Sequence, residues 1–364
     1  MNPHEHALDY PFDQTLPAAG EAIEAAPGIL WIRMELPFAL NHVHLYLLRD
    51  RFEGREGFTA IDTGIASDDT RARWDAVIGQ ALGGLPIVRV LCTHMHPDHL
   101  GLADWLVGRF GAPLWMTPAE YAMGRLLATA PRRDGSHARA HLRRCGVPEG
   151  VLLEQVSERS RLHFPSLVPA VPEAFTRLRA DEPVAIGGRD WRVVVGTGHS
   201  PEHASLYCAD WPGGPVLLAG DMVLPRISTN VSAFDLEPDA DPVSWYLRSL
   251  SHYAGCAPDT LVLPAHGRPF RGLATRIGQL RAHHAERLDA VRAACARAPL
   301  TAFDAVPVVF GRSFDAHQSM FAIGEALAHL NALWRAGALE RRAGEDGVVR
   351  FAPGAGGPRR PQAS

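Results

Sequence analysis

The sequence has 364 residues and a formal net charge of −4, and its length allows either one large domain or two of ordinary size. Hydrophobic residues make up 46% of the chain and charged residues 21%, proportions that are ordinary for a globular protein. No apolar run is long enough to span a membrane, so the composition argues against a membrane protein and predicts a soluble one.

The start of the chain lacks a basic stretch followed by an apolar one, so we expect no secretory signal. The five cysteines are widely separated and form no C-x-x-C pair, which favours a reducing compartment over a disulfide framework. Every basic residue is arginine, which excludes a P-loop lysine and a Schiff-base lysine. We therefore expect a cytoplasmic protein without either of these lysine chemistries.

Charge is unevenly distributed along the chain. Arginine outnumbers the acidic residues in 271–364, whereas acidic residues are in excess before residue 271. An acidic body does not suit a polyphosphate backbone, so we expect a small-molecule substrate. The basic C-terminal part leaves nucleic acid open as a less favoured partner.

Strand signals begin after an N-terminal arm that we assign to residues 1–27. Apolar and β-branched runs predict an opening sheet and a helix, at residues 29–34, 43–48, 58–62 and 70–82. Asp62 ends the third run, where its carboxylate either orients a neighbouring imidazole or caps the following helix. His42 and His44 are interpreted as strand residues with at most a minor contact to substrate.

Three histidines and an aspartate then follow one another closely at the end of a buried-strand pattern over residues 86–92. His94 and His96 are two apart on an extended segment, so they point to the same side. Asp98 and His99 fall in the first turn of a helix and can turn toward a second point. Imidazole and carboxylate are the usual ligands of zinc and its neighbours. The cluster therefore predicts two neighbouring metal ions instead of unrelated surface histidines.

Beyond the cluster, the residue patterns predict a helix at 100–110, a strand at 113–116 and a helix at 118–130. Residues 131–182 are rich in Arg, Pro and Ala, and we interpret them as a helical insertion with helices near 138–145 and 172–178. We expect this insertion to fold over the metal face and shape the substrate pocket. Residues that could line the pocket, although the core is the favoured place for each one singly, are Trp115, Met116, Tyr121, Met123, His163, Phe164 and Phe175.

Three later segments each place a His or Asp directly after an apolar run and a small residue, as a ligand at a strand end requires. These residues are His199, Asp221 and His266. His203 follows closely and is assigned a structural role near the site, with contact to substrate as the alternative. Arg226 lies in the loop after Asp221, where it either binds an anionic group or forms a surface salt bridge.

The His-x-His-x-Asp-His motif and these later residues together resemble the metal site of the metallo-β-lactamase-fold hydrolases, with a glyoxalase II-like motif. The match covers roughly residues 28–270, and its segments follow the order of the family. This resemblance implies an α/β fold, specifically a four-layer αββα metallo-β-lactamase sandwich. It also implies two divalent metal ions per chain, with zinc as the first choice and iron or manganese as alternatives.

The resemblance also assigns the ligands. The seven residues form three sets, with His94, His96 and His199 for the first ion, Asp98, His99 and His266 for the second, and Asp221 as a bridge. A hydroxide held between the ions would attack the substrate while one ion receives the developing negative charge, and we assign catalytic roles to Asp98 and His266. Because the whole set is present, a one-iron oxygenase and a metal-free relative are both disfavoured.

After the last ligand the pattern changes to helices and a hairpin. The expected elements are a helix at 277–295, a capping box at 301–304, a helix at 320–334 and a hairpin of 339–342 and 348–351. This order is similar to the winged-helix extension in one branch of the family, so we assign 271–351 to a winged-helix-like domain and 352–364 to a disordered tail. Packing, a pocket lid or a homodimer explains this domain better than nucleic acid, because its helix face is not strongly basic.

Function is thus predicted at two levels. The metal motif predicts a metal-dependent hydrolase, and the acidic body and apolar pocket wall favour the carbonyl of a thioester, ester or lactone. The alternative is a metal-dependent endoribonuclease of the winged-helix branch. A binding or regulatory protein with a vestigial site is a third hypothesis, which requires loss of metal or of turnover.

Overall fold

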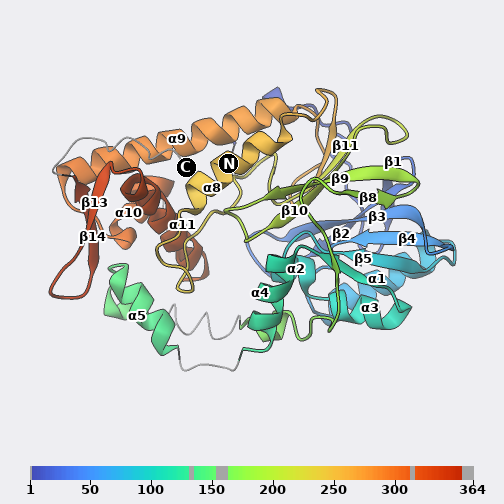
Figure 1. The fold of residues 1–364 in the computed structure, drawn as a ribbon, viewed down its shortest axis with the longest axis horizontal. Coiled ribbons are helices and arrows are strands. Elements are labelled where there is room, and N and C mark those ends of the chain that lie inside the picture. Colours follow the sequence, from blue (N-terminus) through green and yellow to red (C-terminus); the bar gives the residue numbers. More distant parts are fainter. Residues whose placement is uncertain (1, 131–134, 153–162, 312–315, 355–364) are drawn as a thin grey trace. The chain divides into compact units, whose positions relative to one another are not determined.

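The structure is a computed structural model that describes residues 2–130, 135–152, 163–311 and 316–354. The chain divides into two compact units, which interleave along the sequence (Figure 1). The first unit consists of the described parts of 1–131, 164–229 and 249–277, and the second of the described parts of 132–163, 230–248 and 278–364. The domain boundaries that we placed at residues 28, 271 and 352 stay predictions.

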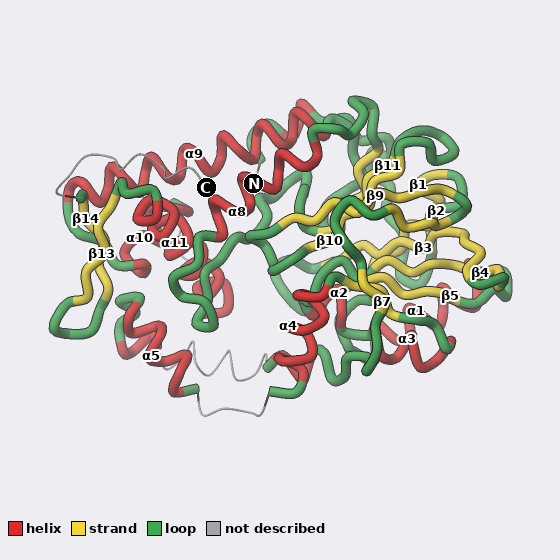
Figure 2. Tube along the Cα trace, in the orientation of Figure 1, coloured by secondary structure: helices red, strands yellow, loops and turns green. Residues whose placement is uncertain are grey.

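Two β-sheets form the centre of the first unit (Figure 2). The seven-stranded sheet contains, in spatial order, β1 (Ala22–Ala26), β2 (Ile29–Glu35), β3 (His42–Phe52), β4 (Arg55–Ile61), β5 (Ile87–Leu91), β6 (Leu114–Met116) and β7 (Thr176–Arg177). The five-stranded sheet contains, in spatial order, β12 (Leu261–Pro264), β11 (Val216–Gly220), β10 (His203–Cys208), β9 (Arg189–Gly196) and β8 (Pro183–Ile186). Because β1 starts at Ala22, the sheet extends into the stretch that we interpreted as an N-terminal arm.

Both faces of the seven-stranded sheet are buried. Successive side chains of a strand point to opposite sides, so each strand contributes to two different cores. On β2, Ile29 and Trp31 join a core shared with the five-stranded sheet, whereas Ile32 and Met34 join a core with helices. The helices of this unit are η1 (Glu5–Ala7), α1 (Asp68–Ala81), α2 (Pro97–Leu100), α3 (Ala103–Phe110), α4 (Pro118–Ala128), α7 (Phe164–Leu167) and η2 (Leu250–Tyr253). Figure 1 shows α1 and α3 on the same side of that sheet.

Most elements predicted for the first unit are present, including the opening strands and the strand that leads into the histidine cluster. The helix predicted near residues 172–178 is wrong. There the chain forms β7, which pairs with β6 through Trp115 and Thr176. Pairing at the sheet edge overrides the helix propensity of this short segment, which also begins at a proline.

The elements of the second unit whose bounds lie within the described residues are helices and a hairpin. They are α5 (Ser136–Arg144), α8 (Pro242–Ser249), α9 (Leu273–Arg297), which starts in the first unit, α10 (Ala302–Phe310), α11 (Ala316–Arg335), β13 (Leu339–Ala343) and β14 (Val349–Pro353). The predicted capping box is confirmed, since Thr301 accepts from the Asp304 backbone and Asp304 accepts from that of Thr301. The winged-helix interpretation stays a prediction, and most of the predicted disordered tail, 355–364, lies outside the described residues.

The part of the chain that the structure describes contains no candidate membrane-spanning helix. None of its helices combines the length and the apolar character needed to cross a bilayer.

Candidate metal centre

The seven candidate ligands lie in the first unit, each just beyond the end of a strand. β5 ends at Leu91, and the chain turns through His94 and His96 into α2, where Pro97 occupies the first helical position. Proline is tolerated there because the first backbone N–H groups of a helix have no partner within it. The other ligands follow β9, β11 and β12. Four separate strand ends therefore converge on one site.

Potential ligand atoms of these residues form two groups, within each of which all atoms lie within 4.8 Å of one another. The first group is His94, His96, His199 and Asp221, and the second is Asp98, His99 and His266. Within the first group, the His94 Nε2 atom is 2.9 Å from His96 Nδ1 and 3.2 Å from His199 Nε2. Nitrogen atoms at such distances can share one metal ion.

Asp221 connects the two groups. Its Oδ2 atom lies 3.3 Å from His199 Nε2 in the first group. Its Oδ1 atom lies 3.6 Å from His99 Nε2 and 3.4 Å from His266 Nε2 in the second. One carboxylate thus faces both groups with different oxygen atoms, which is the arrangement of a bridging ligand.

Hydrogen bonds on the far side of two imidazoles fix which nitrogen faces the centre. His99 Nδ1 is 2.8 Å from Asp62 Oδ2, and His266 Nδ1 is 2.7 Å from the backbone carbonyl of His42. Because both partners accept, each Nδ1 carries a proton, and Nε2 is the nitrogen that faces the centre and can bind a cation. Asp62 is therefore an orienting residue, and the N-cap of α1 is Ser67 instead.

Two buried atoms of the centre have no hydrogen-bond partner among the described residues, namely Nε2 of His99 and Oδ1 of Asp221. An unsatisfied buried polar group costs about 1–3 kcal/mol. A cation bound by both atoms would remove this cost, and imidazole with carboxylate is a ligand set of divalent metals. The residues present therefore fit a metal ion.

Electrostatics differ between the two groups. Burial opposes protonation of His99, yet the carboxylates of Asp98 and Asp62 raise its pKa to about 9. Burial, reinforced by the neighbouring His199, lowers the pKa of His96 to about 3. His96 thus presents a neutral imidazole, whereas the second group concentrates negative potential that a divalent cation would neutralise in place of protons.

The backbone at Asp221 is held by His203, which is fully buried on β10. The Asp221 N–H donates to His203 Nε2 over 3.0 Å, so this nitrogen serves as an acceptor within the protein. Gly220 has a φ of +50°, and a Cβ there would lie 2.3 Å from His203 Nε2. Only glycine fits between the strand and this imidazole, which explains the Gly-Asp sequence at the end of β11.

The sequence around this centre matches a known protein family. The family model described as Metallo-beta-lactamase superfamily matches residues 42–266, the stretch that contains all seven candidate ligands. The chain belongs to this superfamily. A second family model, described as Metallo-beta-lactamase-like, C-terminal domain, matches residues 288–354.

Two proteins of Bacillus subtilis (strain 168) are similar to this member of the superfamily. Probable metallo-hydrolase YqjP is 25% identical over 315 residues, which cover 84% of this chain and 92% of that protein. Probable metallo-hydrolase YflN is 24% identical over 269 residues, which cover 70% of this chain and 89% of that protein.

Solved structures are similar over almost the whole chain. A beta-lactamase domain protein from Burkholderia ambifaria has a TM-score of 0.89 and 52% identity, covering 96% of this chain and 99% of that one. A metallo-beta-lactamase family protein from Thermus thermophilus, TTHA1429, has a TM-score of 0.71 and 28% identity, covering 90% and 99%. The predicted fold class, an α/β metallo-β-lactamase sandwich with a C-terminal helical extension, is confirmed.

Most of the residues that we considered for the lining of a substrate pocket pack in or against the core. Met116 is fully buried, and Tyr121, Phe164 and Phe175 pack against the same hydrophobic cluster. Trp115 packs against the core between the sheets. These contacts agree with the core role that we favoured for each of them.

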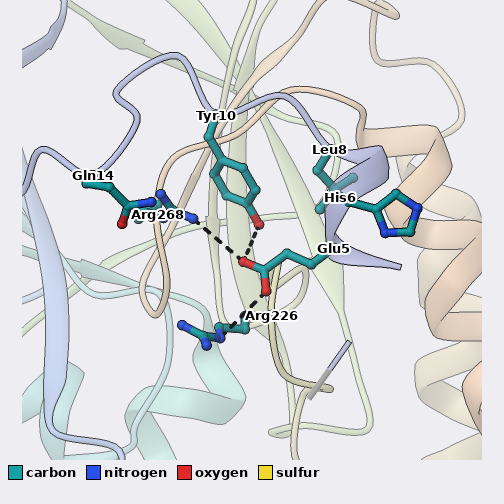
Figure 3. Close-up of a pocket in the computed structure, with 7 residues that line it drawn as sticks. All are labelled: Glu5, His6, Leu8, Tyr10, Gln14, Arg226 and Arg268. Atoms are coloured by element: carbon teal, nitrogen blue, oxygen red, sulfur yellow. Dashed lines mark hydrogen bonds and ion pairs between the residues drawn. The ribbon is translucent and has the colours of Figure 1, made fainter. Parts of the chain in front are cut away.

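Arg226 lines a cavity of about 490 Å³ together with Arg268 and residues of the N-terminal arm (Figure 3). The Glu5 carboxylate lies between the two guanidinium groups, 3.6 Å from Arg226 Nε and 3.8 Å from Arg268 Nη2. Tyr10 donates its hydroxyl to the same carboxylate over 3.0 Å. Of the two roles considered for Arg226, the structure shows the salt bridge, within the chain itself.

Proposed function

We propose that the chain is a dinuclear metal-dependent hydrolase that acts on the carbonyl group of a thioester, ester or lactone. Membership of the metallo-beta-lactamase superfamily and similarity to two probable metallo-hydrolases support a metal-dependent hydrolase. The observation that carries the proposal is the orientation of Asp221, whose two oxygens face different groups of candidate ligands. Zinc is the first choice of metal, because nitrogen ligands with a few carboxylates suit it.

Each residue of the centre has a distinct task in this proposal. The first group would hold one cation and the second group the other, with Asp221 touching both. Bound there, two divalent cations would supply an activated water and a Lewis acid for the carbonyl oxygen of the substrate. Asp98 Oδ2 lies 3.6 Å from His99 Nε2 and 3.4 Å from His266 Nε2, which supports our assignment of Asp98 and His266 to the second ion.

An endoribonuclease remains the second candidate, because helices followed by a hairpin occur in the C-terminal extension. The arginines of this extension argue for the first candidate. Arg341 forms two hydrogen bonds with the Asp239 carboxylate and stacks on Trp334, and Arg342 pairs with Glu340. Guanidinium groups engaged by the chain's own carboxylates are poorly placed to neutralise phosphates.

Metal analysis combined with an activity screen tests the proposal. We expect about two equivalents of metal per chain, and turnover of a thioester, ester or lactone that stops after chelation and returns when metal is added back. Cleavage of single-stranded RNA alone would favour the endoribonuclease. Purified protein that is fully active without metal would refute both.

A further inference from the structure

Glu120 is a fully buried carboxylate at the start of α4. It follows Pro118 and Ala119 in the first turn of that helix, where a negative charge is favourable. Glutamate is almost never fully buried unless it is paired. Its burial therefore calls for specific partners.

Three donors meet this carboxylate. Oε1 accepts from Ser200 Oγ over 2.6 Å and from the Glu202 backbone N–H over 2.7 Å. Oε2 accepts from the Met95 backbone N–H over 2.9 Å. Hydrogen bonds to an ionised acceptor are about twice as strong as neutral ones, so the three together offset part of the cost of burial.

These donors come from the two loops that carry the histidines of the first ligand group. Met95 lies between His94 and His96, whereas Ser200 directly follows His199. One carboxylate thus joins two loops that are far apart in sequence. The contact is reciprocal, because the Ala119 N–H donates to the Glu202 side chain over 3.0 Å.

We propose that Glu120 is a positioning residue for the first metal ion, holding the His94 and His96 loop at a fixed distance from the His199 loop. This inference rests on the proposed metal centre. The second group has its own support in Asp62 and in the carbonyl of His42, neither of which contacts Glu120 in the described hydrogen bonds. Loss of Glu120 is therefore expected to affect one ion selectively.

Glu120→Gln tests this selectivity with an almost isosteric change. An amide offers one oxygen and one NH₂ group, so it can accept from Ser200 and Glu202 or from Met95, but not from both loops. We expect wild-type protein, stripped of metal and titrated with Co²⁺, to bind two equivalents by its visible absorption bands. In the variant, one equivalent should keep its affinity and the other should weaken about 10–100-fold, as is typical when a supporting residue of a metal site is lost.

An Asp98→Ala background, in which the second group is disabled, shows whether the weakened Co²⁺ equivalent is the one bound by the first group. The single remaining Co²⁺ site should weaken by the same factor when Glu120→Gln is added. Ser200→Ala, which removes one of the three donors, should give a smaller weakening of the same equivalent. Glu182→Gln is the matched control, because its exposed carboxylate pairs with Arg179, and it should leave both affinities unchanged.

Several results would contradict the inference. If Glu120→Gln binds two equivalents of Co²⁺ with wild-type affinity, the inference about Glu120 is overturned and the proposed metal centre is not. Equal weakening of both equivalents, with a lower thermal midpoint of the metal-free protein, would show a general structural role and also overturn it. Wild-type protein that binds no Co²⁺ would overturn the proposed centre and this inference together.

Discussion

Each unit of the molecule buries a cluster of histidines, and the two clusters differ in what their nitrogen atoms face. In the first unit, imidazoles and carboxylates from four strand ends direct their free atoms toward common points. In the second unit, His284 and His329 are fully buried and stacked with ring centroids 5.3 Å apart. Among the described residues of that unit, no three potential ligand atoms converge.

Hydrogen bonding explains the difference. His329 Nδ1 donates to the Glu325 carbonyl over 2.7 Å, so its Nε2 can only accept from His284 Nδ1, 3.2 Å away. Burial lowers the pKa of His329 to about 4, whereas in the metal centre nearby carboxylates overcome burial and raise that of His99 to about 9. Buried histidines alone therefore do not make a metal site; convergent lone pairs with neighbouring carboxylates do.

The largest expected effect comes from Asp221→Ala. Because one oxygen of this carboxylate faces each ligand group, its removal should cost both metal equivalents and abolish hydrolysis. Elemental analysis of the purified variant measures the loss. His284→Ala removes an equally buried imidazole from the second unit and should keep both equivalents. Two equivalents retained in Asp221→Ala would show that the bridge is misassigned.

Asp98→Ala should have a smaller and one-sided effect. Its carboxylate faces His99 and His266, so the second ion should be lost while the first remains. Elemental analysis should give about one equivalent. Asp210→Ala, which removes an exposed carboxylate paired with Arg189, is the control and should leave two. Loss of both ions from Asp98→Ala would mean that the groups do not bind independently.

Glu325→Gln probes the second cluster through pH. Burial raises the pKa of Glu325 to about 8, although Arg287 acts against the rise. In the unfolded chain a glutamate has a pKa of about 4.3. The free energy of unfolding of the wild type therefore falls as the pH rises from about 4.3 to about 8, because the unfolded chain releases this proton more readily than the folded protein. Glutamine does not ionise, and the variant should therefore gain about 1–4 kcal/mol relative to wild type between pH 4 and pH 8.

Urea unfolding at both pH values measures this shift, and metal content should be unchanged. A relative stability that does not change with pH would show that Glu325 ionises as freely in the folded protein as in the unfolded chain.

The smallest effect is expected from joint replacement of Arg335, Arg341 and Arg342 by alanine. Arg341 and Arg342 are paired with carboxylates, and Arg335 donates to the Asp239 carbonyl. Binding of single-stranded RNA should be weak before and after the change. Tight binding by the wild type that falls steeply with salt and disappears in the variant would place the endoribonuclease first.

The sequence by itself predicted His94, His96, Asp98 and His99 as ligands from local chain geometry, and the resemblance to a known family added His199, Asp221 and His266. A strand that ends in a short turn directs the next polar residues to the edge of the sheet, and the spacing of His94, His96, Asp98 and His99 encodes two directions within one segment. The segments ending at His199, Asp221 and His266 repeat that local pattern. The structure brings all seven residues together.

Only the tertiary structure decided which residues support them. His266 is oriented by a carbonyl 224 positions away in the chain, and Glu120 joins donors from loops 25 and 82 positions away. Nothing in the short-range pattern distinguishes Glu120 from an ordinary first-turn glutamate, and residues 172–178 carried a helix-like pattern yet contain the edge strand Thr176–Arg177 and no helix. Local periodicity specifies which side of an element is buried, whereas partners distant in sequence are selected by packing, which no short segment encodes.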